Sequence, residues 1–382
     1  MNTWLTSSQQ AALDHVTAYA RTRRGEAQQT IKYLCRMCDI APELFDAAVA
    51  ALRTVRVALH FHPDRPDSQL KTVAAALLES GLYKSQFETM LSNGSVSAHP
   101  GGERDLWERR LFGGAYNREG STNAHRPKYG SLNLFPHPDG PSPRFGSCYF
   151  LLKPEVTARC TFTYTDSHQD PKEKGTLEEF DDILAALMTD IFLYDSALGE
   201  SEITVPRLFR HLADGLAPDL SLDLRHRAAA RNLNHYIEAQ VHGDVLLSQD
   251  VEFLVADPSF QSTEVGETMV GLAAIYGFPL KWHAGFTLPV TEVPRDFRGP
   301  TMPSLAARVA PGGLLETSMI GPAVMDLKRS PEAWQNRGSP SEVLQELKLL
   351  WHVLVRFGEP WAPGRQGAKA RNSRTMSSGS RT

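Results

Sequence analysis

Residues 236–243 form a predicted strand whose polar side chains alternate with aliphatic ones. Successive side chains of a strand point to opposite faces, so the aliphatic residues share one face and the polar residues share the other. An acid, an amide and an imidazole in one row are typical of a cleft wall, whereas a solvated strand more often presents lysine, threonine or serine. We therefore interpret the polar face as a candidate site wall. Its side chains are Tyr236, Glu238, Gln240 and His242.

A second predicted strand, which begins near Thr54, ends in basic and imidazole side chains. Apolar and polar residues alternate along it, so His60 and His62 share one face, and Arg65 follows at its exit. Imidazole and guanidinium groups donate hydrogen bonds to anions and amides. Two histidines at this spacing followed by an arginine indicate a candidate functional face, and a structural role for these residues stays open.

One familiar catalytic motif and two familiar phosphate-binding motifs are missing from the sequence. It contains no G-x-S-x-G, no G-x-x-x-x-G-K-[ST] and no G-x-G-x-x-G that opens a helix. Metal-dependent hydrolysis stays open as an alternative, because the chain offers residue types that zinc binds. These residues are His60, His62 and His242, with Asp64 or Glu238.

Transfer of a glycosyl group fits the residue types better. Breaking a bond to an anomeric carbon passes through an oxocarbenium-like state that a neighbouring carboxylate stabilises. If the leaving group is nicotinamide, no strong general acid is needed, because the base departs neutral from a cation. Such a site also needs an aromatic ring and donors for an amide and a pyrophosphate. The chain offers Glu238, Tyr129 or Tyr116, and Arg65 with His60 and His62.

Composition excludes some classes of partner. The 382 residues carry a net charge of −4, so no global field attracts nucleic acid or an anionic membrane. We see neither a secretory signal nor an apolar run of the roughly 20 residues that span a bilayer. Four cysteines do not form a disulfide framework. We expect a cytoplasmic protein, or one delivered into a host cell without a readable signal peptide.

The pattern of elements predicts an α+β protein with four parts. Residues 1–53 are mainly helical, residues 54–290 form the catalytic domain, and residues 291–360 form an extension that ends in an amphipathic helix. Capping boxes are expected at two helix starts, from Thr6 or Ser7 with Gln9 or Gln10 and from Ser339 with Glu342. Residues 361–382 are a disordered basic tail. Within the catalytic domain, residues 107–147 are rich in glycine, proline and asparagine, and we interpret them as an ordered ligand loop.

Six segments of the chain together resemble a bacterial and fungal domain family long labelled as of unknown function, which looks like the mono-ADP-ribosyltransferases. The resemblance covers roughly residues 55–290. It implies a split, twisted β-sandwich with NAD as a substrate in the cleft. The segments are HFHPDR (60–65), SQFET (85–89), FGGAY (112–116), RPKYG (126–130), PRFGS (143–147) and EAQVHG (238–243).

The resemblance also implies an activity and an acceptor. The related enzymes include bacterial effectors that modify arginine, and NAD-dependent glutamate dehydrogenase is one acceptor. The chain is thus expected to be an effector-like or toxin-like transferase of ADP-ribose to a protein side chain. Two alternatives stay open, which are an NAD glycohydrolase and a catalytically inactive module that binds a nucleotide or a protein.

Residue roles follow from the resemblance, motif by motif. Glu238 is the expected catalytic acid; arginine-specific members place their catalytic glutamate two positions later, which is Gln240 here, and Glu88 is the runner-up. Arg65 with His62 is expected to hold NAD, and Ser92 or Tyr129 to line the nicotinamide pocket. The full expected set for NAD binding is His60, His62, Arg65, Ser92, Tyr129 and Arg144.

Overall fold

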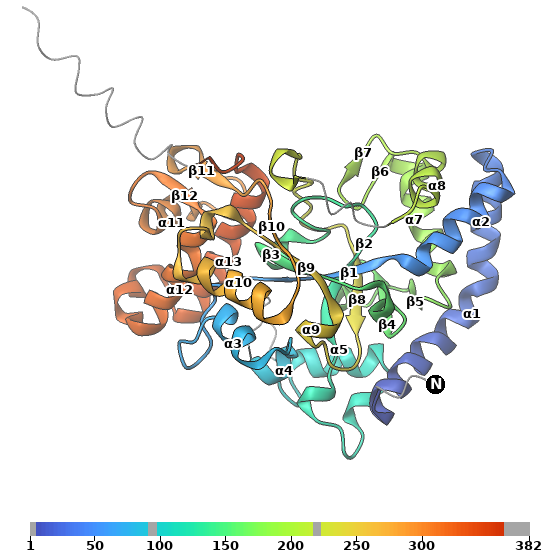
Figure 1. Cartoon of the computed structure of the whole chain (residues 1–382), viewed down its shortest axis with the longest axis horizontal. Coiled ribbons are helices and arrows are strands. Elements are labelled where there is room, and N and C mark those ends of the chain that lie inside the picture. Colours follow the sequence, from blue (N-terminus) through green and yellow to red (C-terminus); the bar gives the residue numbers. More distant parts are fainter. Residues whose placement is uncertain (1–4, 91–97, 217–222, 363–382) are drawn as a thin grey trace, which may run out of the picture.

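The computed structural model describes residues 5–90, 98–216 and 223–362 (Figure 1). The predicted ligand residue Ser92 and the predicted basic tail from residue 363 onward lie outside the described residues. The protein is of mixed α+β class, as expected. Its N-terminal helices lie at one end of a central sheet and its C-terminal helices at the other.

Eight strands form one open mixed sheet, in the order β10-β9-β3-β1-β2-β8-β4-β5. All neighbours are antiparallel except β9 and β10. Two further sheets have two strands each, β6 with β7 and β11 with β12. The strands are β1 (Arg56–Phe61), β2 (Lys128–Asn133), β3 (Cys148–Leu152), β4 (Cys160–Tyr164), β5 (Lys174–Thr176), β6 (Ser196–Ala197), β7 (Glu200–Ser201), β8 (Ile237–Val241), β9 (Val251–Ala256), β10 (Leu280–Trp282), β11 (Thr287–Pro289) and β12 (Leu314–Glu316).

The sheet forks between β1 and β2. The two strands pair only from Arg56 opposite Asn133 to Ala58 opposite Ser131. Beyond that point residues 59–61 of β1 pair with β3 alone, while residues 128–130 of β2 stay paired with β8. The eight-stranded sheet therefore has two halves that are joined at this short contact.

The strand β2 corrects the interpretation of residues 107–147 as a loop. This stretch contains the end of a helix and a central strand of the sheet. The sequence of β2, Lys-Tyr-Gly-Ser-Leu-Asn, holds no β-branched residue, so it lacks the usual strand signal. Its conformation is fixed by pairing with distant strands on both sides rather than by local propensity.

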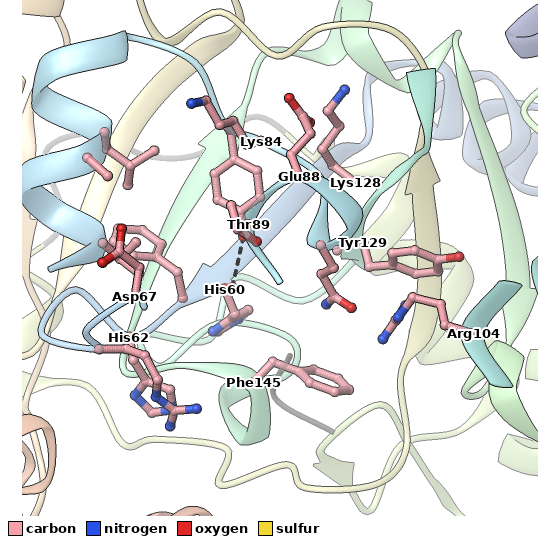
Figure 2. Close-up of a pocket in the computed structure, with 18 of the residues that line it drawn as sticks. His60, His62, Asp67, Lys84, Glu88, Thr89, Arg104, Lys128, Tyr129 and Phe145 are labelled. Atoms are coloured by element: carbon pink, nitrogen blue, oxygen red, sulfur yellow. Dashed lines mark hydrogen bonds between the residues drawn. The ribbon is translucent and has the colours of Figure 1, made fainter. Parts of the chain in front are cut away.

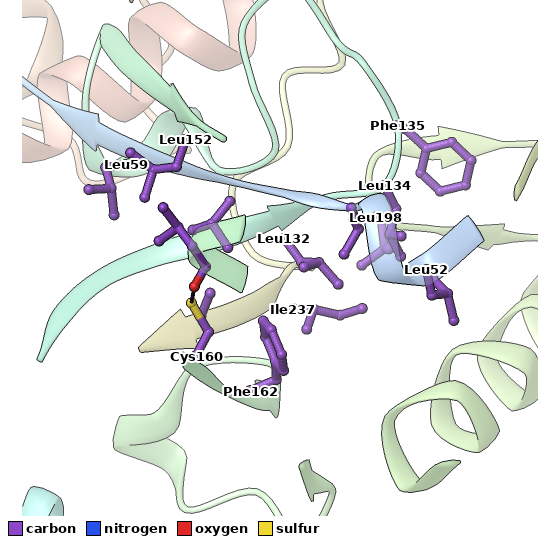
Figure 3. Close-up of a cluster of buried hydrophobic side chains, with 14 of the residues drawn as sticks. Leu52, Leu59, Leu132, Leu134, Phe135, Leu152, Cys160, Phe162, Leu198 and Ile237 are labelled. Carbon is purple, nitrogen blue, oxygen red and sulfur yellow. Dashed lines mark hydrogen bonds between the residues drawn. The ribbon is translucent and has the colours of Figure 1, made fainter. Parts of the chain in front are cut away.

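The apolar face of β8 is buried, as its alternation predicts. Ile237, Ala239 and Val241 are fully buried in the main hydrophobic core. Figure 3 shows Ile237 with Leu132 and Phe162 from the two neighbouring strands. Burial of such side chains contributes about 1.5–3 kcal/mol each. This core fixes which face of β8 points away from it, toward the candidate site.

Helices surround the sheet, and both predicted capping boxes are present, at Thr6 with Gln9 and at Ser339 with Glu342. No helix in the described ranges is long and apolar enough to cross a membrane. The helices are α1 (Ser7–Met37), α2 (Pro42–Ala51), α3 (Val73–Ser80), α4 (Gln86–Thr89), α5 (Glu103–Leu111), α6 (Pro154–Thr157), α7 (Asp181–Tyr194), α8 (Val205–Ala213), α9 (Leu247–Asp250), α10 (Glu264–Tyr276), α11 (Met302–Val309), α12 (Ile320–Arg329) and α13 (Pro340–Phe357).

The C-terminal helices have a hydrophobic core of their own. The predicted apolar stripe of α13 is buried there, including Leu347, Leu350 and Leu354. Trp351 belongs to the same stripe, and its Nε1 donates a hydrogen bond of 2.8 Å to the carbonyl oxygen of Pro143. Pro143 begins a 3-10 turn, η4 (Pro143–Phe145), next to the fork. The helix α13 is therefore hydrogen-bonded to the segment that borders the candidate site.

Candidate functional site

A cavity of about 550 Å³ lies at the fork of the sheet (Figure 2). Both halves of the sheet line it: His60 and His62 come from β1 and its exit, Tyr129 from β2, and Glu238 from β8. Figure 2 shows the two histidines on one side and Tyr129 with Arg104 on another. The volume falls within the range of about 300–1,000 Å³ that is usual for small-molecule sites.

Basic residues outnumber acidic ones in the cavity lining, seven to four. An excess of cations in a concave, partly apolar site favours a ligand with negative charge. The basic residues are Arg65, Lys71, Lys84, Arg104, Lys128, Arg144 and Lys348. The acidic residues are Asp67, Glu88, Asp166 and Glu238.

Glu238, the predicted catalytic acid, lies in the cavity wall and is only 5% exposed. Its Oε1 accepts a hydrogen bond of 2.9 Å from Nε2 of Gln240. Burial raises the pKa of Glu238 to about 8, and the neighbouring charge of Asp166 adds to the effect. The carboxyl group is therefore largely protonated at neutral pH. A cation placed beside it would favour the ionised form.

Gln240 and His242 lie behind Glu238, fully buried and outside the cavity lining. Burial lowers the pKa of His242 to about 3, so its imidazole is neutral and carries one N–H. The hydroxyl of Thr161 donates to Oε1 of Gln240 at 2.7 Å and lies 3.1 Å from Nε2 of His242. Because that hydroxyl proton is already used, we assign the imidazole proton to Nε2.

With this assignment, the side chains form a chain of hydrogen bonds in which each group donates to the next, and the chain ends at the carboxyl group of Glu238. The hydroxyl of Tyr116 donates to Nδ1 of His242, and Nε2 of His242 donates to Thr161. Thr161 donates to the amide oxygen of Gln240, which turns the amide nitrogen toward Glu238. Gln240 thus touches the predicted catalytic acid rather than the cavity, and it orients that acid through a fixed amide.

Arg104 and Trp107 of α5 border the same cavity, and the sequence analysis did not identify them. The guanidinium of Arg104 lies 4.3 Å from the ring centroid of Trp107 and 4.9 Å from that of Tyr129. Among the described residues, Nε of Arg104 and Nε1 of Trp107 are buried without a hydrogen-bond partner. Their spacing of three residues places them on one side of α5, but the sequence interpretation assigned residues from 107 onward to a loop, so this signal was missed.

A buried ion-pair group holds α5 against β2. Nη1 of Arg126 lies 2.8 Å from a carboxylate oxygen of Glu108, and Nη2 of Arg126 pairs with Asp105. The hydroxyl of Tyr129 donates to the other oxygen of Glu108 at 2.7 Å. These contacts explain the position of Tyr129: its ring faces the cavity and Arg104, while its hydroxyl is used structurally.

The two histidines predicted to bind NAD have different surroundings. His60 has both ring nitrogens near backbone groups, with Nδ1 3.0 Å from the carbonyl of Gly146 and Nε2 accepting from Ser142 N at 3.4 Å. Burial lowers the pKa of His60 to about 3, so the ring is neutral and shapes the wall. His62 forms no hydrogen bond within the described residues. Its ring centroid lies 5.3 Å from that of Trp351, and the two ring planes are nearly perpendicular. Its nitrogens are available to a ligand.

Three cations line the cavity on the His62 side. Arg65 follows β1 and is buried, and this burial lowers its pKa. Arg144 lies in η4, and its guanidinium donates to the side-chain oxygen of Asn234 at 3.4 Å. Lys348 comes from α13, and burial, followed by the charges of Arg144 and Arg65, lowers its pKa to about 8. Sequence reasoning predicted the two arginines and missed the lysine, which is more than 200 residues from Arg144.

Glu88, the runner-up acid, lines the same cavity and is half-buried. Its Oε2 accepts a hydrogen bond of 2.8 Å from Ser85 N, which caps the short helix α4. The described residues contain no cluster of three or more histidine, cysteine or acidic side chains arranged to hold a metal ion. The residues considered above for zinc are therefore not gathered into one such group.

Comparison with protein families gives one match, over residues 56–357, to a model described as a protein of unknown function (DUF3626). No curated protein matches the chain. The match crosses the predicted domain boundary at residue 290 and ends in α13, so it includes the helix that contributes Lys348. Since it spans more than half of the 382 residues, the chain belongs to the DUF3626 family.

Proposed function

We propose that the cavity binds NAD and that the protein transfers ADP-ribose from NAD to a protein side chain. One observation carries this proposal: Glu238 is buried at the fork of the sheet, in a cavity that Arg65, Arg144 and Lys348 also line. NAD has matching features, which are a cationic nicotinamide ring bonded to a ribose and a doubly charged pyrophosphate. The aromatic group of Trp107 and Tyr129 offers a surface for the ring.

The raised pKa of Glu238 is consistent with this chemistry. When the nicotinamide cation lies beside the carboxyl group, ionisation is favoured and the carboxylate stabilises the oxocarbenium-like ribose. The bond between the anomeric carbon and the ring nitrogen breaks, and its electron pair leaves with neutral nicotinamide. A nitrogen of the acceptor then bonds to the anomeric carbon and loses a proton, and in this proposal the carboxylate of Glu238 accepts that proton.

The forked sheet supports the finer fold proposal, a relative of the split ADP-ribosyltransferase sheet. The cavity lies where β1 and β2 separate, so residues from both halves reach one ligand. Arginine as the acceptor residue, glutamate dehydrogenase as an acceptor protein and an effector-like or toxin-like role rest on the resemblance, and we propose them on that ground.

Labelled NAD incubated with the full chain and a cell lysate tests the reaction class. Label on a discrete protein band is the expected result, and purified glutamate dehydrogenase is the first acceptor to examine. Free ADP-ribose without a labelled band would replace transfer with glycohydrolysis. Absence of both products would contradict the proposal and leave a binding module.

Two matched variants then test the catalytic acid. Glu238→Gln is expected to lower turnover by about 10²–10⁴-fold and to keep NAD affinity, because only the transition state needs the carboxylate. Glu88→Gln changes the other candidate glutamate of the same cavity in the same way, and a much smaller loss is expected. A larger loss in Glu88→Gln would move the catalytic role to Glu88.

A further inference from the structure

We propose that α13 completes an anion subsite, in which Lys348 joins Arg144 and Arg65 to hold the diphosphate group of the ligand. The three side chains line one cavity and come from three separate segments, which are α13, η4 and the exit of β1. The inference deepens the proposed function and rests on it for the identity of the whole ligand. The C-terminal helices are then part of the substrate site.

One face of α13 accounts for the position of Lys348. Lys348, Trp351 and His352 are spaced by three and four residues, so they lie on one side of the helix. Trp351 is fully buried, hydrogen-bonded to Pro143 O at 2.8 Å and edge-on to the ring of His62. Lys348 is one turn earlier and is thereby held over the junction of η4 with the end of β1.

The carboxylates of Asp64 and Asp166 act as neighbouring charges on Arg65 and Lys348 respectively, but neither Lys348 nor Arg144 forms an ion pair with an acid in the described residues. Within the described residues Lys348 forms no hydrogen bond or ion pair, although it is only partly exposed. The guanidinium of Arg144 donates the 3.4 Å hydrogen bond to Asn234 and forms no ion pair with an acid among the described residues. Its Nε is buried there without a hydrogen-bond partner. Holding like charges together in a poorly solvated place is unfavourable, and an anion between them offsets the cost.

The ligand class follows from the kind and number of donors. Guanidinium groups donate two parallel hydrogen bonds to phosphate oxygens, and a lysine adds a compact charge. Several cations spread along one wall suit the two linked phosphates of a diphosphate better than a single phosphate. The remaining cavity, toward Trp107 and Glu238, leaves room for the group that the diphosphate carries.

Calorimetric titration of the full chain with inorganic pyrophosphate tests the subsite without any catalytic step. We expect pyrophosphate to bind more tightly than inorganic phosphate. Lys348→Met is expected to weaken pyrophosphate binding about tenfold or more, because a charge-assisted contact is lost. Arg356→Met is the matched control, because Arg356 is an exposed cation on the same helix, and no change is expected.

The outcomes separate this inference from the proposed function. Equal pyrophosphate affinity in Lys348→Met and the unchanged protein, or an equal loss in Arg356→Met, overturns the subsite. Lysine-dependent binding of pyrophosphate without any turnover of NAD supports the subsite and contradicts the transferase. If Lys348→Met turns over NAD with the same KM as the unchanged protein, the transferase is supported and the subsite is contradicted. If Lys348→Met does not fold, Lys348→Gln and Lys348→Arg give the same comparison, with affinity kept only in the arginine variant.

Discussion

The two ends of the cavity bury opposite charges by different means. At the acid end, Glu238 is held from behind by a series of hydrogen bonds within the sheet. At the cation end, Lys348 comes from a helix outside the sheet and lies near enough to Arg144 for the two charges to repel each other. Burial raises the pKa of Glu238 to about 8 and lowers that of Lys348 to about 8. Each end is thus arranged for a ligand group of the opposite charge.

The first way to test this comparison is the pH dependence of turnover, where the largest effect is expected. Glu238 must be ionised, so kcat/KM should rise about tenfold per pH unit up to about pH 8. Above that pH, Lys348 loses its charge and kcat/KM should fall. Lys348→Arg should keep the activity at high pH. A flat profile between pH 5.5 and 9.5 would contradict the assignment of both ends.

A second test disturbs the packing of Gly146, which directly follows η4, against the end of β1. A Cβ at Gly146 would lie 2.3 Å from the backbone of Phe61 at the end of β1. Gly146→Ala should therefore lower the free energy of unfolding by about 3 kcal/mol or more, as measured in urea. Gly271→Ala is the control, because nothing lies within 4 Å of its Cβ position in α10. That variant should be stabilised by about 0.5–1 kcal/mol.

A third test isolates the acid end through stability. A carboxyl group whose folded-state pKa is raised binds more protons in the folded state, so stability falls as pH rises from about 4.5 to about 8. Glu238→Gln does not titrate, so its stability relative to the unchanged protein should increase across this window. Each pKa unit corresponds to about 1.4 kcal/mol, which predicts a difference of a few kcal/mol at pH 8. Thermal unfolding of both proteins at pH 5, 6.5 and 8 measures this difference in stability. If the difference is the same at all three pH values, the raised pKa of Glu238 is contradicted.

The smallest effect is expected from the donor series behind Glu238. Thr161→Val removes the hydroxyl that fixes the amide of Gln240, and kcat should fall about tenfold while KM for NAD stays unchanged. Thr161→Ser should restore most of the activity. An equal loss in both variants, or a change confined to KM, would show that the series does not orient the acid.

The sequence predicted well those features that depend on local pattern. Alternation along residues 236–243 gave the strand β8 and its buried aliphatic face, and the capping residues gave the starts of α1 and α13. It also brought Arg65 and Glu238 together as candidates, and both line the cavity. The transferase chemistry assigned to them stays a prediction.

The polar face of β8 shows the limit of that reasoning. Period two predicts that Glu238, Gln240 and His242 share a face, and they do lie on one side of the strand. Of the three, only Glu238 lines the cavity. Gln240 is hydrogen-bonded to Thr161, 79 residues away in the sequence, and His242 to Tyr116, 126 residues away. No local pattern carries this information.

What the sequence by itself determined is therefore which side chains share a face and where the helices begin, since both follow from the geometry of one segment. The tertiary structure alone decided that β2 is a central strand and that Lys348 completes the cavity. Both depend on contacts between distant segments, such as the hydrogen bond between Trp351 and Pro143, 208 residues apart. Such contacts form only when separate hydrophobic surfaces pack together, and this packing sets which polar groups reach a ligand.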